Sequence, residues 1–189
     1  GPSGATNARK RGLPHVICAT THTAKFKPET LPAIGVFDVV EHIEDDVGFL
    51  IHLWELLIPG GMLYLTVPAY QSLWSQEDVD GGHFRRYTLS NLIYRMGKSG
   101  FKVSYSSYFF TYLPLFVFFL RTIPYKLNLV RSSSSSSIKE DHSTPKGIGS
   151  KILDFLHKWE LNKIRGSKRI PMGGSCMIAA RKPVKSFAH

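Results

Sequence analysis

Cysteine is scarce in this chain of 189 residues, which contains only Cys18 and Cys176. Two cysteines cannot build a disulfide-rich secreted scaffold, and we expect both to be small buried side chains inside strands. No apolar run reaches the roughly 18 residues that a membrane-spanning helix needs. No secretory signal heads the chain either, so the expected compartment is the cytoplasm.

Acidic residues are scarce in the last part of the chain. Residues 121–189 hold fourteen lysines and arginines but only four acidic residues, which accounts for the whole formal net charge of +10. Such asymmetry favours an anionic partner, either a membrane surface or a nucleic acid. Nucleic acid is the weaker option, because the basic residues are not interleaved with stacking aromatic residues. A solvated basic face without a specific partner is the alternative.

Apolar runs and amphipathic segments alternate over the first 107 residues. The predicted strands are residues 15–19, 33–37, 62–67 and 101–105, and the predicted helices are residues 4–10, 46–58 and 89–99. Asp45 or Asp46 can cap the second helix, and Thr88 can cap the third. Strands that alternate with helices of this length predict an α/β domain built on a parallel sheet.

The pattern breaks at residue 108, and we divide the chain there. Residues 1–107 are predicted to form a partial core domain, residues 108–165 an insertion, and residues 166–189 the final core strand with a basic tail. The insertion contains an apolar run at residues 108–120, a serine tract at residues 132–137 and an amphipathic helix at residues 148–164. The serine tract cannot build a core, so we expect a linker there.

The apolar run of the insertion would expose a large apolar surface unless something covers it. One alternative is that the helix at residues 148–164 folds back onto the run and forms a lid. The side chains that would make this contact are Ile152, Leu156 and Trp159. The other alternative, which we favour, is that the run lies at the inner face of a membrane. The side chains that would then contact lipid phosphates are Arg121, Lys126 and Arg131.

Side chains that handle protons follow two of the predicted strands. Asp38, Glu41 and His42 come directly after residues 33–37, and His83 lies in the loop that follows residues 62–67. Ligands bind outside the carboxyl ends of the strands in an open α/β sheet, so we expect His42 and His83 to face one cleft. Imidazole is well suited to take a proton from a hydroxyl or an amine. The sequence has no G-x-G-x-x-G loop and no Walker-type lysine loop.

Two adjacent arginines, Arg85 and Arg86, lie in the same loop as His83. They could hold an anionic acceptor by bidentate hydrogen bonds. The alternative is a loop that is pinned by salt bridges from these arginines to Asp78 and Asp80.

A divalent cation is a further possibility at this edge of the sheet. Carboxylate and imidazole donors suit Mg²⁺, Mn²⁺ or Zn²⁺. The candidate ligands would be Asp38, Glu41, His42 and His83. We predict no metal, because a histidine at the start of a helix is more commonly held by hydrogen bonds alone.

Three blocks of sequence are distinctive: FDVVEHIEDD at residues 37–46, IPGGMLYLTVP at residues 58–68 and GHFRRYT at residues 82–88. Together they resemble the class I S-adenosylmethionine-dependent methyltransferases. The resemblance implies a Rossmann-like, mostly parallel sheet with an antiparallel last strand, and S-adenosylmethionine as the cofactor. It also implies that the family's first two strands and its Gly-rich cofactor loop are missing, as in an amino-terminally truncated domain.

The resemblance and the positions in the predicted sheet together imply three groups of site residues. Cofactor binding is expected at Ala19, Thr20, Phe37 and Asp38. Catalysis is expected at Glu41, His42 and His83. Acceptor binding is expected at Tyr70, Trp74, Asp78, Arg85, Arg86 and Tyr87.

We therefore predict an enzyme that transfers a methyl group to an oxygen or nitrogen of a small or lipid-linked acceptor. The alternative is a non-catalytic module that binds a membrane surface or an anionic polymer, which the basic residues 121–189 and the missing cofactor loop favour. Without two preceding strands, the strand at residues 15–19 would be an unpaired edge. We therefore expect self-association, and weak cofactor binding or none.

Overall fold

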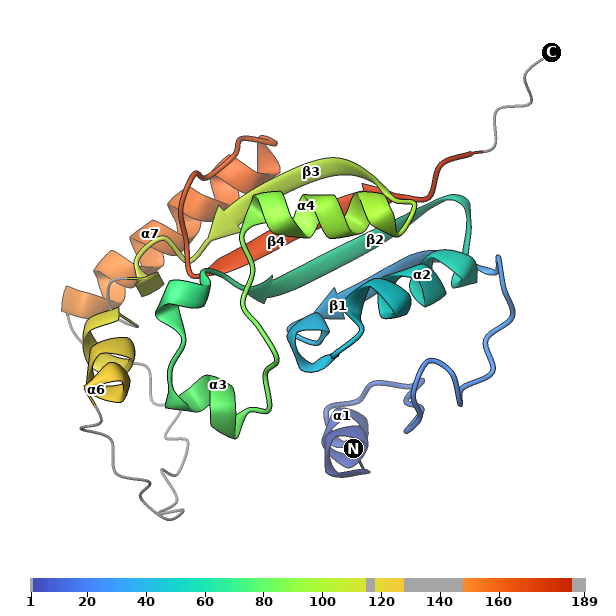
Figure 1. The fold of residues 1–189 in the computed structure, drawn as a ribbon, viewed down its shortest axis with the longest axis horizontal. Helices are drawn as coiled ribbons and strands as arrows, with labels where there is room; N and C mark the ends of the chain where they lie inside the picture. The colour runs from blue at the N-terminus through green and yellow to red at the C-terminus, as the bar shows by residue number, and fades with distance from the viewer. Residues whose placement is uncertain (1, 115–117, 128–147, 185–189) are drawn as a thin grey trace.

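The computed structural model describes residues 2–114, 118–127 and 148–184. In this part of the chain, helices flank one four-stranded sheet (Figure 1). The strands are β1 (Leu31–Phe37), β2 (Leu57–Pro68), β3 (Lys102–Phe109) and β4 (Ser175–Arg181). The predicted α/β class is therefore confirmed.

The strands lie in the order β1-β2-β4-β3. β1 and β2 are parallel, whereas β4 is antiparallel to both β2 and β3. Three strands thus run in one direction, and the last strand of the chain is inserted between two of them in the opposite direction. This arrangement confirms the predicted Rossmann-like sheet with an antiparallel final strand. It also brings the carboxyl ends of β1, β2 and β3 to one edge.

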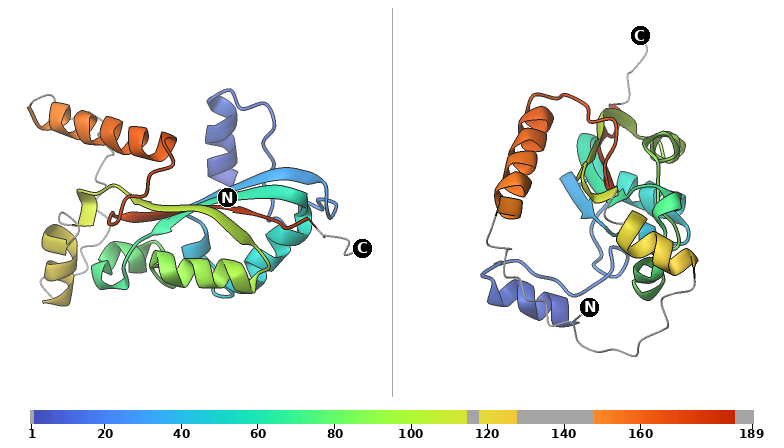
Figure 2. Two further views of the ribbon diagram at one scale, coloured as in Figure 1. Left: turned by 90° about the horizontal axis from the view of Figure 1, so that it is seen from above. Right: turned by 90° about the vertical axis from the view of Figure 1, so that its left-hand side faces the viewer.

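Two helices, α2 (Asp46–Leu56) and α4 (Leu89–Lys98), cover one face of the sheet (Figure 2). Both begin at a predicted cap: the Asp45 side chain accepts a hydrogen bond from the backbone N–H of Gly48, and Thr88 accepts one from Asn91. The helices pack on the sheet through fully buried apolar side chains. These include Leu50, Leu53, Leu63, Leu65, Leu92, Met96 and Ile178.

Short elements cluster at the carboxyl edge of the sheet. The 3-10 helix η1 (Val40–His42) follows β1, and η2 (Gln71–Leu73) and α3 (Gln76–Asp80) follow β2. The π-helix η3 (Phe118–Thr122) and α6 (Ile123–Lys126) come after β3. The two remaining helices, α1 (Pro2–Lys10) and α7 (Ile148–Arg165), lie on the face of the sheet opposite α2 and α4 (Figure 2). Within the described ranges, no helix combines the length and the apolar character needed to span a bilayer.

The strand predicted at residues 15–19 is not formed. Ile17 is 67% exposed, and Cys18 is exposed rather than buried as predicted. An apolar run becomes a strand only when a neighbour pairs with its backbone N–H and C=O groups. Because β1 is the outermost strand of the described sheet, the open edge belongs to β1 and not to residues 15–19. Cys176, in β4, is fully buried as predicted.

The segment Pro59-Gly60-Gly61 does not separate a helix from a strand as predicted. α2 ends at Leu56 and β2 already begins at Leu57, so the segment lies within β2. The pairing with β1 shifts register there, which accommodates the extra residues. Gly60 has a φ of 83°, a left-handed conformation that strongly favours glycine.

The predicted insertion is described in part. Its serine tract at residues 132–137 and residues 115–117 of its apolar run lie outside the described residues. α7 packs against the segment that follows β3: the Glu160 carboxylate accepts hydrogen bonds from the backbone N–H groups of Phe110 and Thr111, and His157 bonds the Tyr112 hydroxyl at 2.8 Å. The helix therefore folds back onto the start of the apolar run through the side chains of His157 and Glu160, while the lid itself stays a prediction. Leu156 is half-buried and Trp159 is 40% exposed.

Candidate active site

The carboxyl edge of β1 holds the first part of the candidate site. Asp38 follows β1 directly with a φ of 51°, which turns the chain into η1. Its backbone N–H donates to the carbonyl of Thr66 in β2, and its carboxylate accepts from the Thr66 hydroxyl at 3.2 Å. The Asp38 side chain is exposed and has no capping role at α2, which Asp45 caps. This aspartate is therefore available to a ligand at the sheet edge.

Glu41, in η1, is a buried carboxylic acid with an incomplete set of partners. Glu41 is 1% exposed, and its Oε2 atom has no hydrogen-bond partner among the residues that the structure describes. Burial raises the pKa of Glu41 to about 7. The Glu41 carbonyl accepts a hydrogen bond from the backbone N–H of Phe84 at 2.7 Å, so the loop that follows α3 is tied to η1.

The two predicted histidines meet next to this carboxylate. The rings of His42 and His83 lie edge to face, with centroids 4.6 Å apart. His42 Nε2 is 4.0 Å from Glu41 Oε1, and one donor atom from each of the three residues lies within 4.8 Å of the others. The structure thus brings the three predicted catalytic residues together from two loops that are about forty residues apart in the chain. Asp38 is not a member of this group.

Asp78, in α3, holds together the loop between β2 and α4 that contains His83 and Arg86. It is 1% exposed and accepts hydrogen bonds from the Ser75 backbone N–H, from His83 Nδ1 at 2.8 Å and from Arg86 Nε at 2.7 Å. Burial alone would raise the pKa of Asp78, but the hydrogen bonds from Arg86 and His83 outweigh it and hold the pKa below its usual value. An ionised carboxylate only accepts hydrogen bonds, so His83 donates through Nδ1–H. Asp78 therefore positions His83, and its role in binding an acceptor stays a prediction.

Arg85, Arg86 and Tyr87 are also held by internal partners. Arg86 binds both oxygens of Asp78, which matches the pinned-loop alternative. Arg85 forms a salt bridge with Asp46 at 2.8 Å, and the Tyr87 hydroxyl donates to the same carboxylate. Tyr87 is 1% exposed, so the structure places it in the core and not on an acceptor.

Two aromatic residues that are predicted to bind the acceptor, Tyr70 and Trp74, lie in the segment that follows β2. Tyr70 has a φ of 58° and stacks on Tyr108 of β3, with ring centroids 5.1 Å apart. Burial raises the pKa of the Tyr70 hydroxyl. Trp74 ends η2 and is half-buried. Tyr70 therefore packs the loop against the sheet, and both residues keep part of their surface accessible.

The predicted cofactor residues divide between two places. Ala19 and Thr20 line a pocket of about 690 Å³ together with Val39, Ile43 and Phe49, beside η1 and the start of α2. Phe37 lies elsewhere: it is 62% exposed and lines a pocket with Tyr64 and Tyr105 on the sheet face that α7 partly covers. Phe37 is therefore not brought to Ala19 and Thr20 as predicted.

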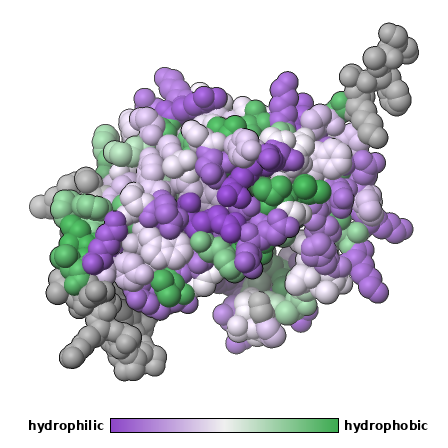
Figure 3. Space-filling model, viewed as in Figure 1, coloured by the Kyte–Doolittle hydropathy of each residue, from purple (hydrophilic) through white to green (hydrophobic). Residues whose placement is uncertain are grey.

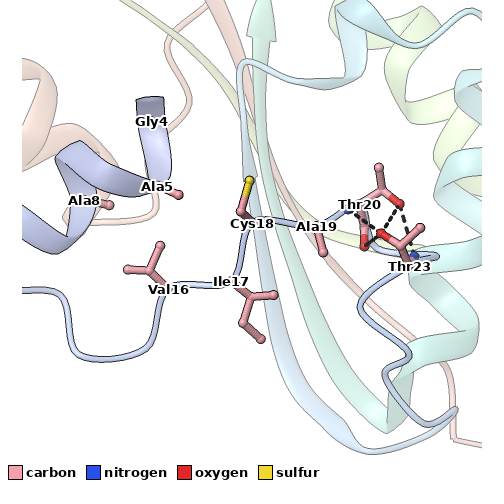
Figure 4. Close-up of a pocket in the computed structure, with 9 residues that line it drawn as sticks. All are labelled: Gly4, Ala5, Ala8, Val16, Ile17, Cys18, Ala19, Thr20 and Thr23. Atoms are coloured by element: carbon pink, nitrogen blue, oxygen red, sulfur yellow. Dashed lines mark hydrogen bonds between the residues drawn. The ribbon is translucent and has the colours of Figure 1, made fainter. Parts of the chain in front are cut away.

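Another pocket, of about 600 Å³, lies on the other side of the segment that contains Ala19 and Thr20. Figure 4 shows its wall, in which Ala5 and Ala8 of α1 lie across from the extended residues 16–20. Hydrogen bonds between Thr20 and Thr23 hold the end of this segment in a tight turn (Figure 4). Ala19 and Thr20 line this pocket and also the pocket beside η1, so the irregular segment lies between the two.

Asp46 is the anchor that the sequence pattern did not identify. It was predicted only as a possible helix cap, but Asp45 has that role. Asp46 is 2% exposed and binds Arg85, Arg95 and the Tyr87 hydroxyl. Its partners lie about forty to fifty residues further along the chain, and no local spacing rule connects them.

Comparison with solved structures identifies the architecture. An S-adenosylmethionine-dependent methyltransferase from Mesorhizobium loti superimposes with a TM-score of 0.56 at 11% identity, covering 96% of this chain and 76% of that one. A SAM-dependent methyltransferase from Archaeoglobus fulgidus does so with a TM-score of 0.50 at 14% identity, covering 90% and 69%. The chain has the fold of the class I S-adenosylmethionine-dependent methyltransferases. No protein-family model and no curated protein sequence matches it.

The methyltransferase fold does not by itself determine the reaction. The [4+2]-cyclase SpnF superimposes with a TM-score of 0.51 at 15% identity, covering 95% of this chain. This chain spans only 62% of the SpnF chain. Because one fold carries different reactions, the activity has to be argued from the site.

Proposed function

We propose that the chain is the catalytic part of an S-adenosylmethionine-dependent methyltransferase that acts on an oxygen or nitrogen nucleophile. The observation that supports this most is the convergence of Glu41, His42 and His83 at the carboxyl edge of a methyltransferase-like sheet. In an open α/β sheet this edge is where ligands bind.

The pocket beside η1 suits the aromatic part of the cofactor. Val39, Ile43 and Phe49 supply apolar walls, while Ala19 and Thr20 close the other side. Asp38 stands at the adjacent sheet edge with an exposed carboxylate that can bind a polar group of the cofactor. The bound cofactor would supply an electrophilic sulfonium methyl group for in-line displacement. The sequence has no G-x-G-x-x-G loop for the methionine part, so we expect the affinity to be low.

The residues of the edge cluster supply orientation and a proton acceptor. The acceptor nucleophile loses a proton as its bond to the methyl carbon forms, and His83 is the residue we assign to take that proton. Asp78 holds His83 through Nδ1, which leaves Nε2 with a free electron pair. Since methyl transfer needs at most one base, the main contribution of the protein is to hold the two reactants in line.

Cofactor binding is the first test. We expect isothermal titration of S-adenosylhomocysteine to give saturable heat at low affinity with this chain. Val39→Trp fills the apolar pocket and should weaken binding at least tenfold. Ile93→Trp, at an equally exposed position on α4, should leave the affinity unchanged. Absence of saturable heat with this chain would contradict the proposal.

A second candidate function, membrane binding, rests on a different surface. Phe118 is 39% exposed, and Phe119 and Leu127 are about 60% exposed, on the short elements η3 and α6. In Figure 3, apolar atoms gather at this end of the molecule, at the left of the view. Lys126, which directly precedes Leu127, is also exposed. An aromatic patch beside basic residues suits an anionic bilayer surface, where each lysine or arginine contributes about 1 kcal/mol. Binding there would bring the edge cluster to a lipid-linked acceptor.

Liposome co-sedimentation tests this candidate. We expect the chain to sediment with vesicles that contain phosphatidylserine at low salt, less so at high salt, and not with neutral vesicles. Phe119→Asp should reduce the bound fraction severalfold, because it places a charge in the apolar patch. The control is Tyr94→Asp, a similarly exposed aromatic position on α4. No sedimentation with anionic vesicles at low salt would refute membrane binding.

A further inference from the structure

The edge cluster has the composition of a metal site. One donor atom each from Glu41, His42 and His83 lies within 4.8 Å of the others. The ligands of a tetrahedral site with bonds of about 2.0 Å lie about 3.3 Å apart, so closure on an ion needs movements of about 1–2 Å. His42 lies in a single helical turn and its side chain is 39% exposed, so it can make such a movement.

A buried oxygen of Glu41 has no partner in the described structure. Oε2 of this 1% exposed carboxylate accepts no hydrogen bond. An unpaired buried polar atom is costly, and native proteins satisfy nearly all such atoms with a partner, water or an ion. A cation at the cluster would supply the missing partner.

The surroundings of His83 complete the argument. Asp78 accepts a hydrogen bond from His83 Nδ1, so Nε2 carries the free electron pair that a metal needs. A carboxylate on the second ring nitrogen is the usual support of a metal-bound histidine. The Arg86 guanidinium is bound to both oxygens of Asp78, and the Arg85 guanidinium to the Asp46 carboxylate and the carbonyls of Ile43 and Glu44. The Asp38 carboxylate adds negative charge at the same edge.

We propose that Glu41, His42 and His83 bind one first-row divalent cation, with Asp78 as the residue that orients His83. Two imidazoles and one carboxylate favour Zn²⁺, Co²⁺ or Mn²⁺ over Mg²⁺ and Ca²⁺, which prefer oxygen ligands throughout. The site goes beyond the proposed function and does not depend on methyl transfer. Three protein ligands leave a coordination position for water or for an acceptor atom, and in that state both histidines are ligands rather than proton acceptors.

Zinc binding to the chelator-treated chain tests the site. Competition with a chromophoric chelator should show one equivalent of Zn²⁺ bound to the wild type. Glu41→Gln and His83→Ala should each weaken binding at least tenfold, because each removes one of three ligands. Titration with Co²⁺ should give visible absorption bands of a nitrogen- and oxygen-ligated ion, and these bands should be lost in His42→Ala. His42 is partly exposed, so this variant reports on the site even if a change at Glu41 prevents folding.

The control is a second pair of histidines in the chain. His22 and His52 stack with centroids 3.8 Å apart, and His52 Nε2 is also buried with no hydrogen-bond partner in the described part of the chain. His52→Ala should leave the zinc affinity unchanged. Loss of binding in His52→Ala but not in Glu41→Gln would overturn the proposal, as would the absence of stoichiometric binding by the wild type. Since cofactor binding is measured separately with S-adenosylhomocysteine, failure of one proposal is distinguishable from failure of the other.

Discussion

Asp46→Ala is expected to lower the free energy of unfolding by about 3 kcal/mol. The carboxylate is 2% exposed and binds two guanidinium groups, of Arg85 and Arg95, together with the Tyr87 hydroxyl. Removing it leaves two neighbouring positive charges without their carboxylate, and the buried Tyr87 hydroxyl keeps a longer bond of 3.4 Å to the Val40 carbonyl. Both arginine side chains are about one quarter exposed and can turn partly to water, which keeps the expected loss at the lower end of the range for buried ion pairs. Urea denaturation followed by circular dichroism measures it.

The adjacent aspartate supplies a matched control for this prediction. Asp45 is exposed and caps α2 through a hydrogen bond from the Gly48 backbone, so Asp45→Ala should cost only about 1 kcal/mol. The two variants remove the same group from neighbouring positions. Equal losses in the free energy of unfolding would show that Asp46 stabilises the fold no more than a helix cap does. Its bonds to Arg85, Arg95 and Tyr87 would then add no further stability.

The regular part of the fold was predictable because its signals are local. The apolar spacing of α2 and α4, their caps at Asp45 and Thr88, and the apolar run of β4 each depend on residues within a few positions. The prediction of a strand at residues 15–19 was wrong for a physical reason. Its apolar side chains resemble those of β1, but strand formation depends on a pairing partner that local sequence does not reveal.

The sequence was sufficient to predict which edge of the sheet holds the candidate site. It was not sufficient to predict which side chains bind one another there. The rule that parallel strands end at one edge was sufficient to bring His42 and His83 together. It could not separate Asp78, which is buried, from Asp80, which is exposed two residues later. The capping box formed with Ser75 turns Asp78 inward, and that orientation determines where Arg86 binds.

The Asp78 network leads to a prediction about the tautomer of His83. Asp78→Ala removes the acceptor of the His83 Nδ1–H group and of the Arg86 guanidinium. Since a free neutral imidazole is not held in the Nδ1–H form by any acceptor, we expect the proton of His83 to redistribute toward Nε2. We also expect a loss of stability of about 3 kcal/mol, because Arg86 is nine-tenths buried and keeps its charge. The ¹⁵N chemical shifts of the His83 ring report the tautomer in the metal-free protein at a pH where the ring is neutral.

Asp80→Ala provides the comparison, since it removes an aspartate from the same short helix. Asp80 is exposed and its carboxylate accepts a hydrogen bond only from Gln76 among the interactions described. This variant should leave the His83 tautomer unchanged and cost well under 1 kcal/mol, as surface substitutions generally do. If His83 keeps its Nδ1–H form in Asp78→Ala, then Asp78 does not set the tautomer. Nε2 would then still carry its free electron pair, but the positioning role of Asp78 toward His83 would lose its structural support. If the tautomer changes in Asp78→Ala alone, Asp78 acts on the chemistry of the cluster as well as on its stability.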